Sequence, residues 1–196
     1  MWDGLAERLS GRIVVLEPIE PRHRDGLRGA AAHDGIFTWS PIDASAEFDL
    51  WFEHALAQRA SGEAVPFATL AAATGAPIGS TRFLTLRPEH RSLEIGHTWL
   101  TPHAWNTGAN VDAKLLQLTH AFETLGCVRV ELKTDARNER SRRAMEAIPA
   151  QFEGVHRRHR IERYGSRDSA WYSVIVDEWP EVKANLERRL KRHLPS

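Results

Sequence analysis

The segment from Ser92 to Gly126 constrains the fold of this chain more than any other. Ser92 to Thr101 has the composition of a β-strand, and a loop begins at Pro102. Beyond the loop, apolar residues recur at intervals of four, three, four and three, at Val111, Leu115, Leu118, Phe122 and Leu125. This spacing predicts one face of an α-helix, which Gly126 ends. A strand that leads through one loop into so regular a helix predicts a domain that mixes strands and helices.

The rest of the chain predicts further strands and helices, with no internal repeat and no Ser/Gly-rich linker. Strands are expected at 12–16, 65–73, 78–86, 127–132, 152–161 and 170–176. Helices are expected at 21–32, at 45–58 with Ser45 as the N-cap, at 139–148 and at 181–193. The predicted fold class is α+β, with a single domain over 1–196 that ends in a charged helical tail at 181–196.

Simple alternation sorts the side chains of the strand at 92–101 onto two faces. One face is expected to carry Leu93, Ile95, His97 and Trp99, and the other Glu94, Gly96, Thr98 and Leu100. The assignment holds only if no β-bulge interrupts the strand.

Charge and cysteine content argue against several classes of protein. Lys plus Arg and Asp plus Glu both number 26, and this balance argues against a nucleic-acid or acidic-membrane partner. The single cysteine, Cys127, excludes an intrachain disulfide and a multi-thiolate zinc site, and we expect no metal. Residues 1–8 lack the pattern of a signal peptide, and the longest weakly polar stretch, 64–73, is too short to cross a membrane. A cytoplasmic protein is therefore expected.

The loop before the helix at 111–125 is a candidate phosphate site. The chain contains no G-x-G-x-x-G, G-x-x-x-x-G-K, G-x-S-x-G or H-E-x-x-H motif. A helix N-terminus, however, exposes unpaired backbone N–H groups at the positive end of the helix dipole, which favours a phosphate or pyrophosphate. Gly108 lets the backbone approach a ligand closely and Asn110 can cap the helix, although both residues could serve only to start it.

A second polar segment, 135–141, opens the short helix at 139–148. At 3.6 residues per turn, Asn138, Ser141 and Met145 lie on one face, and Arg140 and Arg143 point away from it. Asn138 and Ser141 could act only as helix-capping residues. Beside a phosphate-binding loop, they also become candidate ligands for a long cofactor that ends in phosphates.

Together these segments resemble the GNAT superfamily of N-acetyltransferases, and within it the RimJ/RimL-like branch. The resemblance extends from the strand at 11–18 to residues 177–179. It is most specific at Leu93-Glu94-Ile95-Gly96-His97-Thr98-Trp99-Leu100, at Thr107-Gly108-Ala109-Asn110 and at 132–141. It implies a mixed, mostly antiparallel central sheet with helices on both faces. It also implies direct transfer of an acetyl group from acetyl-coenzyme A (acetyl-CoA) to an amine.

The resemblance implies roles for individual residues. Backbone groups around Trp99 and Leu100 would hold the pantetheine arm of the cofactor. Asn138 would bind the cofactor or an ordered water, and Ser141 would lie near the thioester sulfur. The pyrophosphate would lie against the loop formed by Trp105, Asn106, Thr107, Gly108, Ala109 and Asn110.

The chemistry of amine acetylation requires a base and a proton donor. An alkyl ammonium has a pKa near 10.4, so the acceptor must first lose a proton to a base or a water chain. Glu94 is the candidate base, and its alternative role is a strand carboxylate paired with an arginine. Many relatives carry a tyrosine at the position of Met145 to protonate the departing thiolate, so Ser141 or Tyr172 would have to substitute here.

The acceptor is expected to be a primary amine, either a protein N-terminus or a small amine. By the same resemblance, Phe37, Trp39 and His97 are the candidate residues of its pocket. Two alternatives stay open: a transferase that uses another donor such as succinyl-CoA, and a regulatory or interaction module that binds acyl-CoA with little turnover. Exposed strand edges are compatible with a homodimer.

Overall fold

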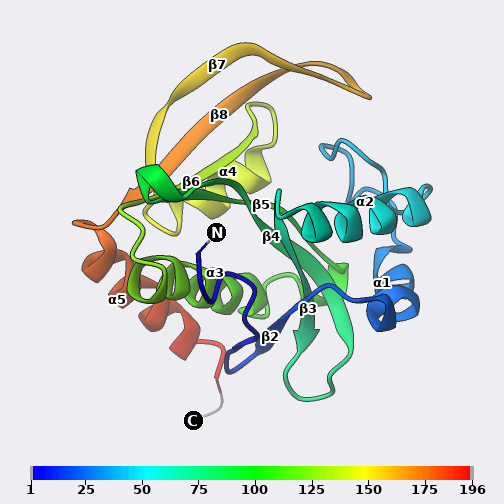
Figure 1. Cartoon of the computed structure of the whole chain (residues 1–196), viewed down its shortest axis with the longest axis horizontal. Coiled ribbons are helices and arrows are strands. Elements are labelled where there is room, and N and C mark those ends of the chain that lie inside the picture. The colour runs from blue at the N-terminus through cyan, green and yellow to red at the C-terminus, as the bar shows by residue number, and fades with distance from the viewer. Residues whose placement is uncertain (1, 195–196) are drawn as a thin grey trace.

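A computed structural model describes residues 2–194 and contains one central sheet (Figure 1). Its strands are β1 (Leu9–Ser10), β2 (Val14–Pro18), β3 (Val65–Ala71), β4 (Pro77–Arg87), β5 (Ser92–Leu100), β6 (Arg129–Asp135), β7 (Gln151–Glu162) and β8 (Gly165–Ile175). Their order across the sheet is β1-β2-β3-β4-β5-β6-β8-β7. Only β5 and β6 pair in parallel, so the predicted α+β class with a mostly antiparallel sheet is confirmed.

Helices cover both faces of the sheet. They are α1 (Arg24–Ala31), α2 (Phe48–Ser61), α3 (Ala109–Thr119), α4 (Glu139–Glu146) and α5 (Trp179–Lys191). In Figure 1, α1 and α2 lie on one side, α3 and α5 on the other, and β7 and β8 curve as an arched pair above the rest. Two separate apolar cores follow from this layering, because each helix pair buries its own face of the sheet. No helix within residues 2–194 is long and apolar enough to span a membrane.

The helix at 111–125 forms as the apolar spacing predicts. α3 runs to Thr119 and continues through a π-helical turn, His120–Thr124, and Gly126 follows with a φ of +65°. Leu118, Phe122 and Leu125 are buried in the core that α3 shares with α5. The N-terminus of α2 differs from the expectation: the helix begins at Phe48, because Ser45 donates its hydroxyl to the Asp43 carboxylate and closes a local turn instead.

A β-bulge breaks the alternation expected in β5. Gly96 pairs with Arg82 and Trp99 with Ser80, so three steps along β5 match two along β4. His97 takes up the extra residue with a φ of +48°. Leu93 and Ile95 therefore face the α3 side, whereas Trp99 packs in the α1/α2 core. The prediction that all three share one face was wrong.

The sheet opens between β5 and β6. The two strands pair only over Ser92–Glu94 and Arg129–Glu131. Beyond Glu94 the edge of β5 that faces β6 has no paired strand, so its backbone polar groups are available to a ligand. Because α3 and α4 follow β5 and β6 respectively, the N-termini of both helices border this opening.

Asp112 fixes the start of β2 to α3. Its carboxylate is almost completely buried, and Oδ2 accepts the backbone N–H groups of Ile13 (2.6 Å) and Val14 (2.9 Å). Gly11 is required beside it, since a Cβ there would lie 2.4 Å from Asp112 Oδ2. The contact joins residues 98 and 99 positions apart in the chain.

We expect Asp112→Ala to lower the free energy of unfolding by about 3 kcal/mol, because two buried backbone donors lose their acceptor. Asp112→Asn keeps one acceptor oxygen and is expected to cost less. Urea denaturation of the two variants measures the difference, and equal losses would argue that the carboxylate charge, rather than the hydrogen bonds, matters.

Candidate active site

One cavity of about 550 Å³ occupies the opening between β5 and β6. At one end it is bounded by the loop before α3, the first turns of α3 and α4, and α5. At the other end it is bounded by β5, β6, the arched pair β7 and β8, and the loop residues Ile36, Trp39, Ser40 and Pro41. A single continuous space therefore connects the predicted phosphate loop with Glu94.

The predicted phosphate loop lies at the α3 end of the cavity. Asn106, Gly108 and Asn110 line it. Gly108 has a φ of +88°, and a Cβ there would come within 2.7 Å of Ile13 and 2.8 Å of His193. Gly108 thus meets both a backbone and a packing requirement. Thr107 and Ala109 hold the loop together. The Thr107 hydroxyl donates to Ala104 O and accepts the backbone N–H of Ala109.

Cationic side chains surround the same end. Arg140 lies over the ring of Trp105 at 4.1 Å, and the Trp105 indole N–H donates to Leu100 O at 2.9 Å. Both residues line the cavity, with Arg143, Arg189 and His193 nearby. The helical wheel placed Arg140 away from the polar face of α4, and this was misleading. The side chain reaches across to an indole on another element, which no periodicity of α4 encodes.

Asn138 and Ser141 both line the cavity at the start of α4. Asn138 is the N-cap, and its Oδ1 accepts the backbone N–H of Ser141 at 3.1 Å. The capping role that was the alternative for Asn138 is therefore present, and its side-chain amide nitrogen is left for a ligand. Met145 also borders the cavity, one turn further along the helix.

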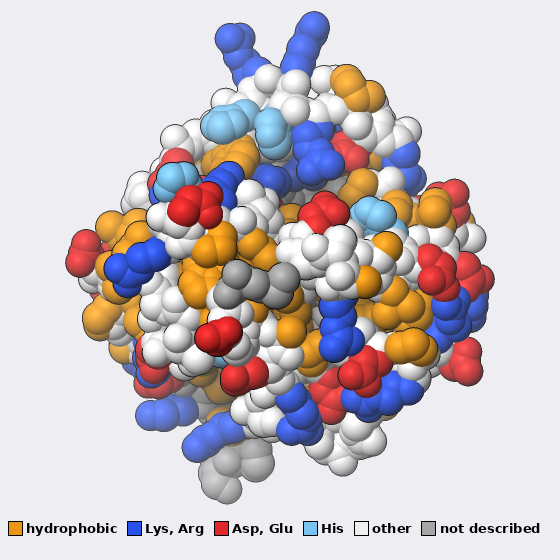
Figure 2. Space-filling model, in the orientation of Figure 1, with side chains coloured by type: hydrophobic (Ala, Val, Ile, Leu, Met, Phe, Trp, Pro, Cys, Tyr) orange, Lys and Arg blue, Asp and Glu red, His pale blue; other side chains and the backbone are white. Residues whose placement is uncertain are grey.

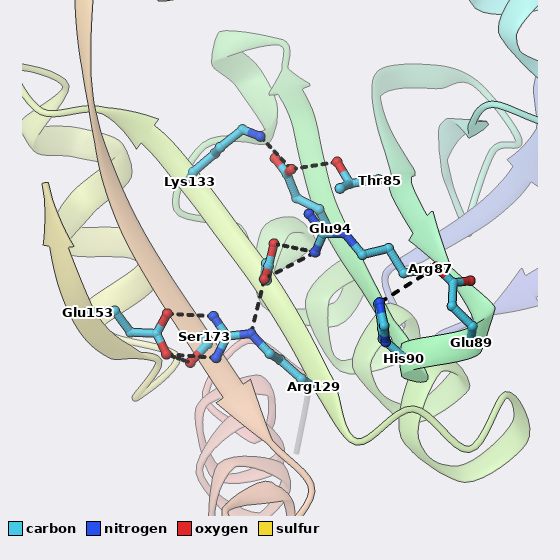
Figure 3. A network of polar contacts seen from close by, with 10 residues as sticks. Thr85, Arg87, Glu89, His90, Glu94, Arg129, Lys133, Glu153 and Ser173 are labelled. Atoms are coloured by element: carbon cyan, nitrogen blue, oxygen red, sulfur yellow. Dashed lines mark hydrogen bonds and ion pairs between the residues drawn. The ribbon is translucent and has the colours of Figure 1, made fainter. Parts of the chain in front are cut away.

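Glu94 is held by two donors from neighbouring strands, as Figure 3 shows. Lys133 Nζ on β6 donates to Glu94 Oε2 at 2.7 Å, and the Thr85 hydroxyl on β4 donates to the same oxygen at 3.0 Å. The partner is thus a lysine rather than the arginine considered from the sequence. The other oxygen, Oε1, is directed toward Gly96, where a Cβ would lie 3.2 Å away. Glu94 is buried yet lines the cavity.

His97 lines the cavity at the bulge, next to Thr98. Burial, followed by the positive charges of Arg82, Arg160, Arg167 and Lys133, lowers the pKa of His97 well below its usual value. The imidazole is therefore neutral at physiological pH.

The predicted acceptor residues divide into two groups. Trp39 lines the cavity, and its ring packs edge to face with Tyr164 near the β7–β8 turn. Arg163 donates to Phe37 O at 2.6 Å and thereby ties the same loop to the arched strands. Phe37 itself is buried against Trp99 and does not line the cavity, so its side chain supports the wall from behind.

Tyr172 and Trp99 lie outside the cavity. The Tyr172 ring is fully buried, and its hydroxyl accepts from Arg142 Nε and donates to Glu146 Oε1, both at 3.1 Å. Burial raises the pKa of Tyr172. Tyr172 therefore does not place a proton donor in the cavity, and Ser141 is left of the two substitutes. Trp99 buries its ring in the α1/α2 core and adjoins the cavity through the strand it belongs to.

Lys114 is a cavity residue that the sequence analysis did not single out. It is 4% exposed, and Nζ donates to Thr98 Oγ1 at 3.0 Å, Gln117 Oε1 at 3.1 Å and Thr81 Oγ1 at 3.4 Å. Within residues 2–194 no carboxylate lies within 4.0 Å of this amine, and burial lowers the pKa of Lys114 to about 7. The sequence could have singled out Lys114, because it is a charged residue on the otherwise apolar face of α3.

The opening in the sheet and its cavity suit a transferase whose donor is long and ends in phosphates. The GNAT acetyltransferase domain model matches residues 14–151, and the chain belongs to this family of acetyl-CoA-dependent acyltransferases. The uncharacterized N-acetyltransferase YoaA of Bacillus subtilis (strain 168) is 29% identical over 98 residues. The match covers 50% of this chain and about half, 55%, of YoaA.

Solved structures agree with the family. A GCN5-related N-acetyltransferase from Brucella melitensis superposes with a TM-score of 0.87 at 30% identity, over 94% of this chain and 86% of that one. Mycobacterium smegmatis RimJ, determined with CoA-disulfide, has a TM-score of 0.81 at 20% identity, over 96% and 97%. At 20% identity, the similarity to RimJ shows a shared fold alone.

Proposed function

We propose that the chain transfers the acetyl group of acetyl-CoA directly to a primary amine, either a protein N-terminus or a small amine. The observation that carries this proposal is the continuity of one cavity from the N-terminus of α3 to Glu94. Such a cavity can hold a long donor that ends in phosphates and an amine acceptor at the same time. A covalent acyl-enzyme is then unnecessary, and the buried Cys127, whose pKa burial raises to about 11, is unsuited to form one.

The residues at the α3 end suit acetyl-CoA. The first-turn amides of α3 lack intrahelical acceptors and lie at the positive end of the helix dipole. Arg140 and Arg143 add cationic donors at the same end. The open edge of β5 offers backbone groups to the pantetheine arm, with the Leu100 carbonyl already accepting from Trp105. When bound, acetyl-CoA supplies a thioester whose acetyl group bonds to the acceptor nitrogen as the bond to sulfur breaks.

Glu94 is the proposed base. Lys133 and Thr85 occupy Oε2 and fix the carboxylate, so Oε1 can accept the proton of the acceptor ammonium, directly or through water. The bulge at His97 interrupts the ladder with β4, and its backbone N–H groups are proposed donors to the carbonyl oxygen of the thioester. Ser141 is the proposed proton donor to the thiolate, and Asn138 the proposed ligand of the cofactor or a water.

Within the family we propose the RimJ/RimL-like branch, which would favour a protein N-terminus as acceptor. The fold shared with Mycobacterium smegmatis RimJ, a protein solved with CoA-disulfide, supports this placement. A cytoplasmic location and a homodimer stay predictions of the sequence.

Calorimetric titration with CoA tests the cofactor site. Micromolar binding is expected, and Arg140→Gln is expected to raise Kd about tenfold, because a charge-assisted contact to phosphate is lost. Arg188→Gln, the same change at an exposed position of α5 that does not line the cavity, is the matched control. Comparison with dephospho-CoA identifies which phosphate Arg140 contacts.

Absence of binding at millimolar CoA would contradict the proposal. Binding without transfer to any amine would instead favour the acyl-CoA-binding module. Transfer rates with acetyl-CoA and with succinyl-CoA as donor show which acyl group is transferred, since the phosphate loop does not select it.

A further inference from the structure

Two arginines oppose each other in the arched pair of strands above Glu94. Arg160 on β7 pairs with Arg167 on β8, and both line the cavity. Like charges directly opposite on an antiparallel pair are normally destabilising. On the face shown in Figure 2, Lys, Arg and His side chains gather in the upper part, over these strands. The arrangement therefore calls for a compensating anion.

Within residues 2–194, Glu162 is the one carboxylate that lies within 4.0 Å of both guanidinium groups. Glu162 Oε1 lies 3.0 Å from Arg160 Nε and 3.9 Å from Arg167 Nη1. Neither contact has hydrogen-bond geometry, and within residues 2–194 this buried oxygen accepts no hydrogen bond. Two guanidinium groups thus share one carboxylate, which leaves one positive charge in excess.

Arg167 is weakly paired in the cavity wall. The residue is 8% exposed, and its only side-chain hydrogen bond within residues 2–194 runs from Nε to Ser169 Oγ at 3.0 Å. Its terminal nitrogens have only looser contacts, with Glu162 Oε1 at 3.9 Å and with the Tyr164 hydroxyl, and such weak pairing is costly for a buried guanidinium unless a ligand binds it. The nearby cation Lys133 is already paired with Glu94 and does not share this need.

We propose that Arg160 and Arg167 bind an oxyanion, a carboxylate or phosphate, carried by the acceptor amine. The inference rests on the proposed function and deepens it, because it names the acceptor's chemical class. A guanidinium fork matches carboxylate and phosphate oxygens in pairs. Glu94 in the same cavity would take the ammonium end, so the acceptor carries both charges.

The electrostatics of the cavity agree with this assignment. The charges of Arg160 and Arg167 are among the causes that lower the pKa of His97, so their field extends into the space beside Glu94. Trp39 and Pro41 also line the cavity, and the Trp39 ring packs against Tyr164 between β7 and β8, so apolar surface borders the cavity beside these strands. An oxyanion there interacts more strongly than one in open solvent.

Initial rates with matched acceptor pairs test the proposal. Leucine against leucinamide probes the carboxylate of a free amino acid, and ethanolamine phosphate against ethanolamine probes a phosphate. Ser-Asp-Ala-Ala amide against Ser-Asn-Ala-Ala amide probes an acidic side chain at a peptide N-terminus. We expect the anionic member of at least one pair to have a kcat/KM at least tenfold higher.

Three variants separate binding from structure. Arg160→Gln, at a half-exposed side chain, is expected to raise KM for the anionic acceptor about tenfold and leave kcat and the neutral acceptor nearly unchanged. Glu162→Gln removes the competing carboxylate and is expected to lower that KM. Arg157→Gln, on the same strand but outside the cavity lining, is the control. A merely structural role for these residues would make all acceptors worse in both cavity variants.

The proposal and the proposed function fail in different ways. Equal kcat/KM within every pair, or unchanged KM in Arg160→Gln, overturns the oxyanion site while acetyl transfer persists. No transfer to any amine overturns the proposed function. Calorimetric binding of N-acetylleucine in the presence of CoA, weakened by Arg160→Gln, is the readout that does not depend on turnover.

Discussion

Replacement of Glu94 by glutamine is expected to lower kcat at least 100-fold and leave Kd for CoA within a factor of two. The glutamine amide keeps the shape of the side chain but cannot accept a proton from an ammonium, and general-base catalysis contributes about 10²–10⁴-fold. Lys133 and Thr85 would still find an acceptor oxygen, so the local fold is preserved. Stopped assays of N-acetyl product and calorimetry with CoA measure the two quantities.

Glu131→Gln is the matched control for this prediction. Glu131 pairs with Glu94 across the parallel strands and is buried in an ionic network with Arg87 and Arg129, outside the cavity lining. The same chemical change there is expected to alter stability but not kcat. A kcat within threefold of wild type would assign amine deprotonation to water or another group.

Stability is expected to rise with pH between about 7 and 10 because of Lys114. Burial lowers its pKa from 10.5 to about 7 in the folded chain. Between these values the unfolded chain holds a proton that the folded chain does not, so raising the pH favours folding, by up to about 1.4 kcal/mol per pH unit. Below pH 7 both states are protonated, and the contribution is at its least favourable and constant.

Lys114→Met is expected to flatten this dependence and to stabilise the protein most at pH 6–7, where the folded chain otherwise buries an ammonium without a carboxylate. Urea denaturation at pH 6, 7.5 and 9 measures it. Lys183→Met, which removes a lysine paired with Glu123 at the surface of α5, is the control and should leave the slope over this range unchanged. If Lys114→Met keeps the wild-type slope, Lys114 titrates normally.

Local sequence was sufficient for most elements of the fold. The apolar spacing from Val111 to Leu125 predicted α3 and its continuation, and Gly75 and Pro77 marked the turn between β3 and β4. The start of β8 was missed, since Ser166, Arg167 and Asp168 are polar. They form a strand because β7 supplies the paired ladder and the cavity takes the Arg167 side chain.

The residues of the candidate site also divide into those that local sequence predicted and those that it did not. Glu94, Gly108 and Ser141 could be proposed because each belongs to a contiguous motif, and the cavity contains all three. Lys133, Arg160 and Arg167 could not, because the cavity that they line is formed by strands and helices far apart in the sequence. Tyr172 was a predicted substitute for the tyrosine that many relatives carry at the position of Met145, but tertiary packing places its hydroxyl between Arg142 and Glu146.

By itself, the sequence determined the order of elements, the family and the loop that begins α3, since these depend on contacts between near neighbours along the chain. Only the tertiary structure decided the face on which Trp99 lies, because the bulge at His97 depends on the pairing of β5 with β4. The tertiary structure also decided the charges in the part of the cavity proposed for the acceptor. Burial and long-range pairing set the protonation of Lys114 and the excess charge of Arg160 and Arg167, and neither is a property of a residue in isolation.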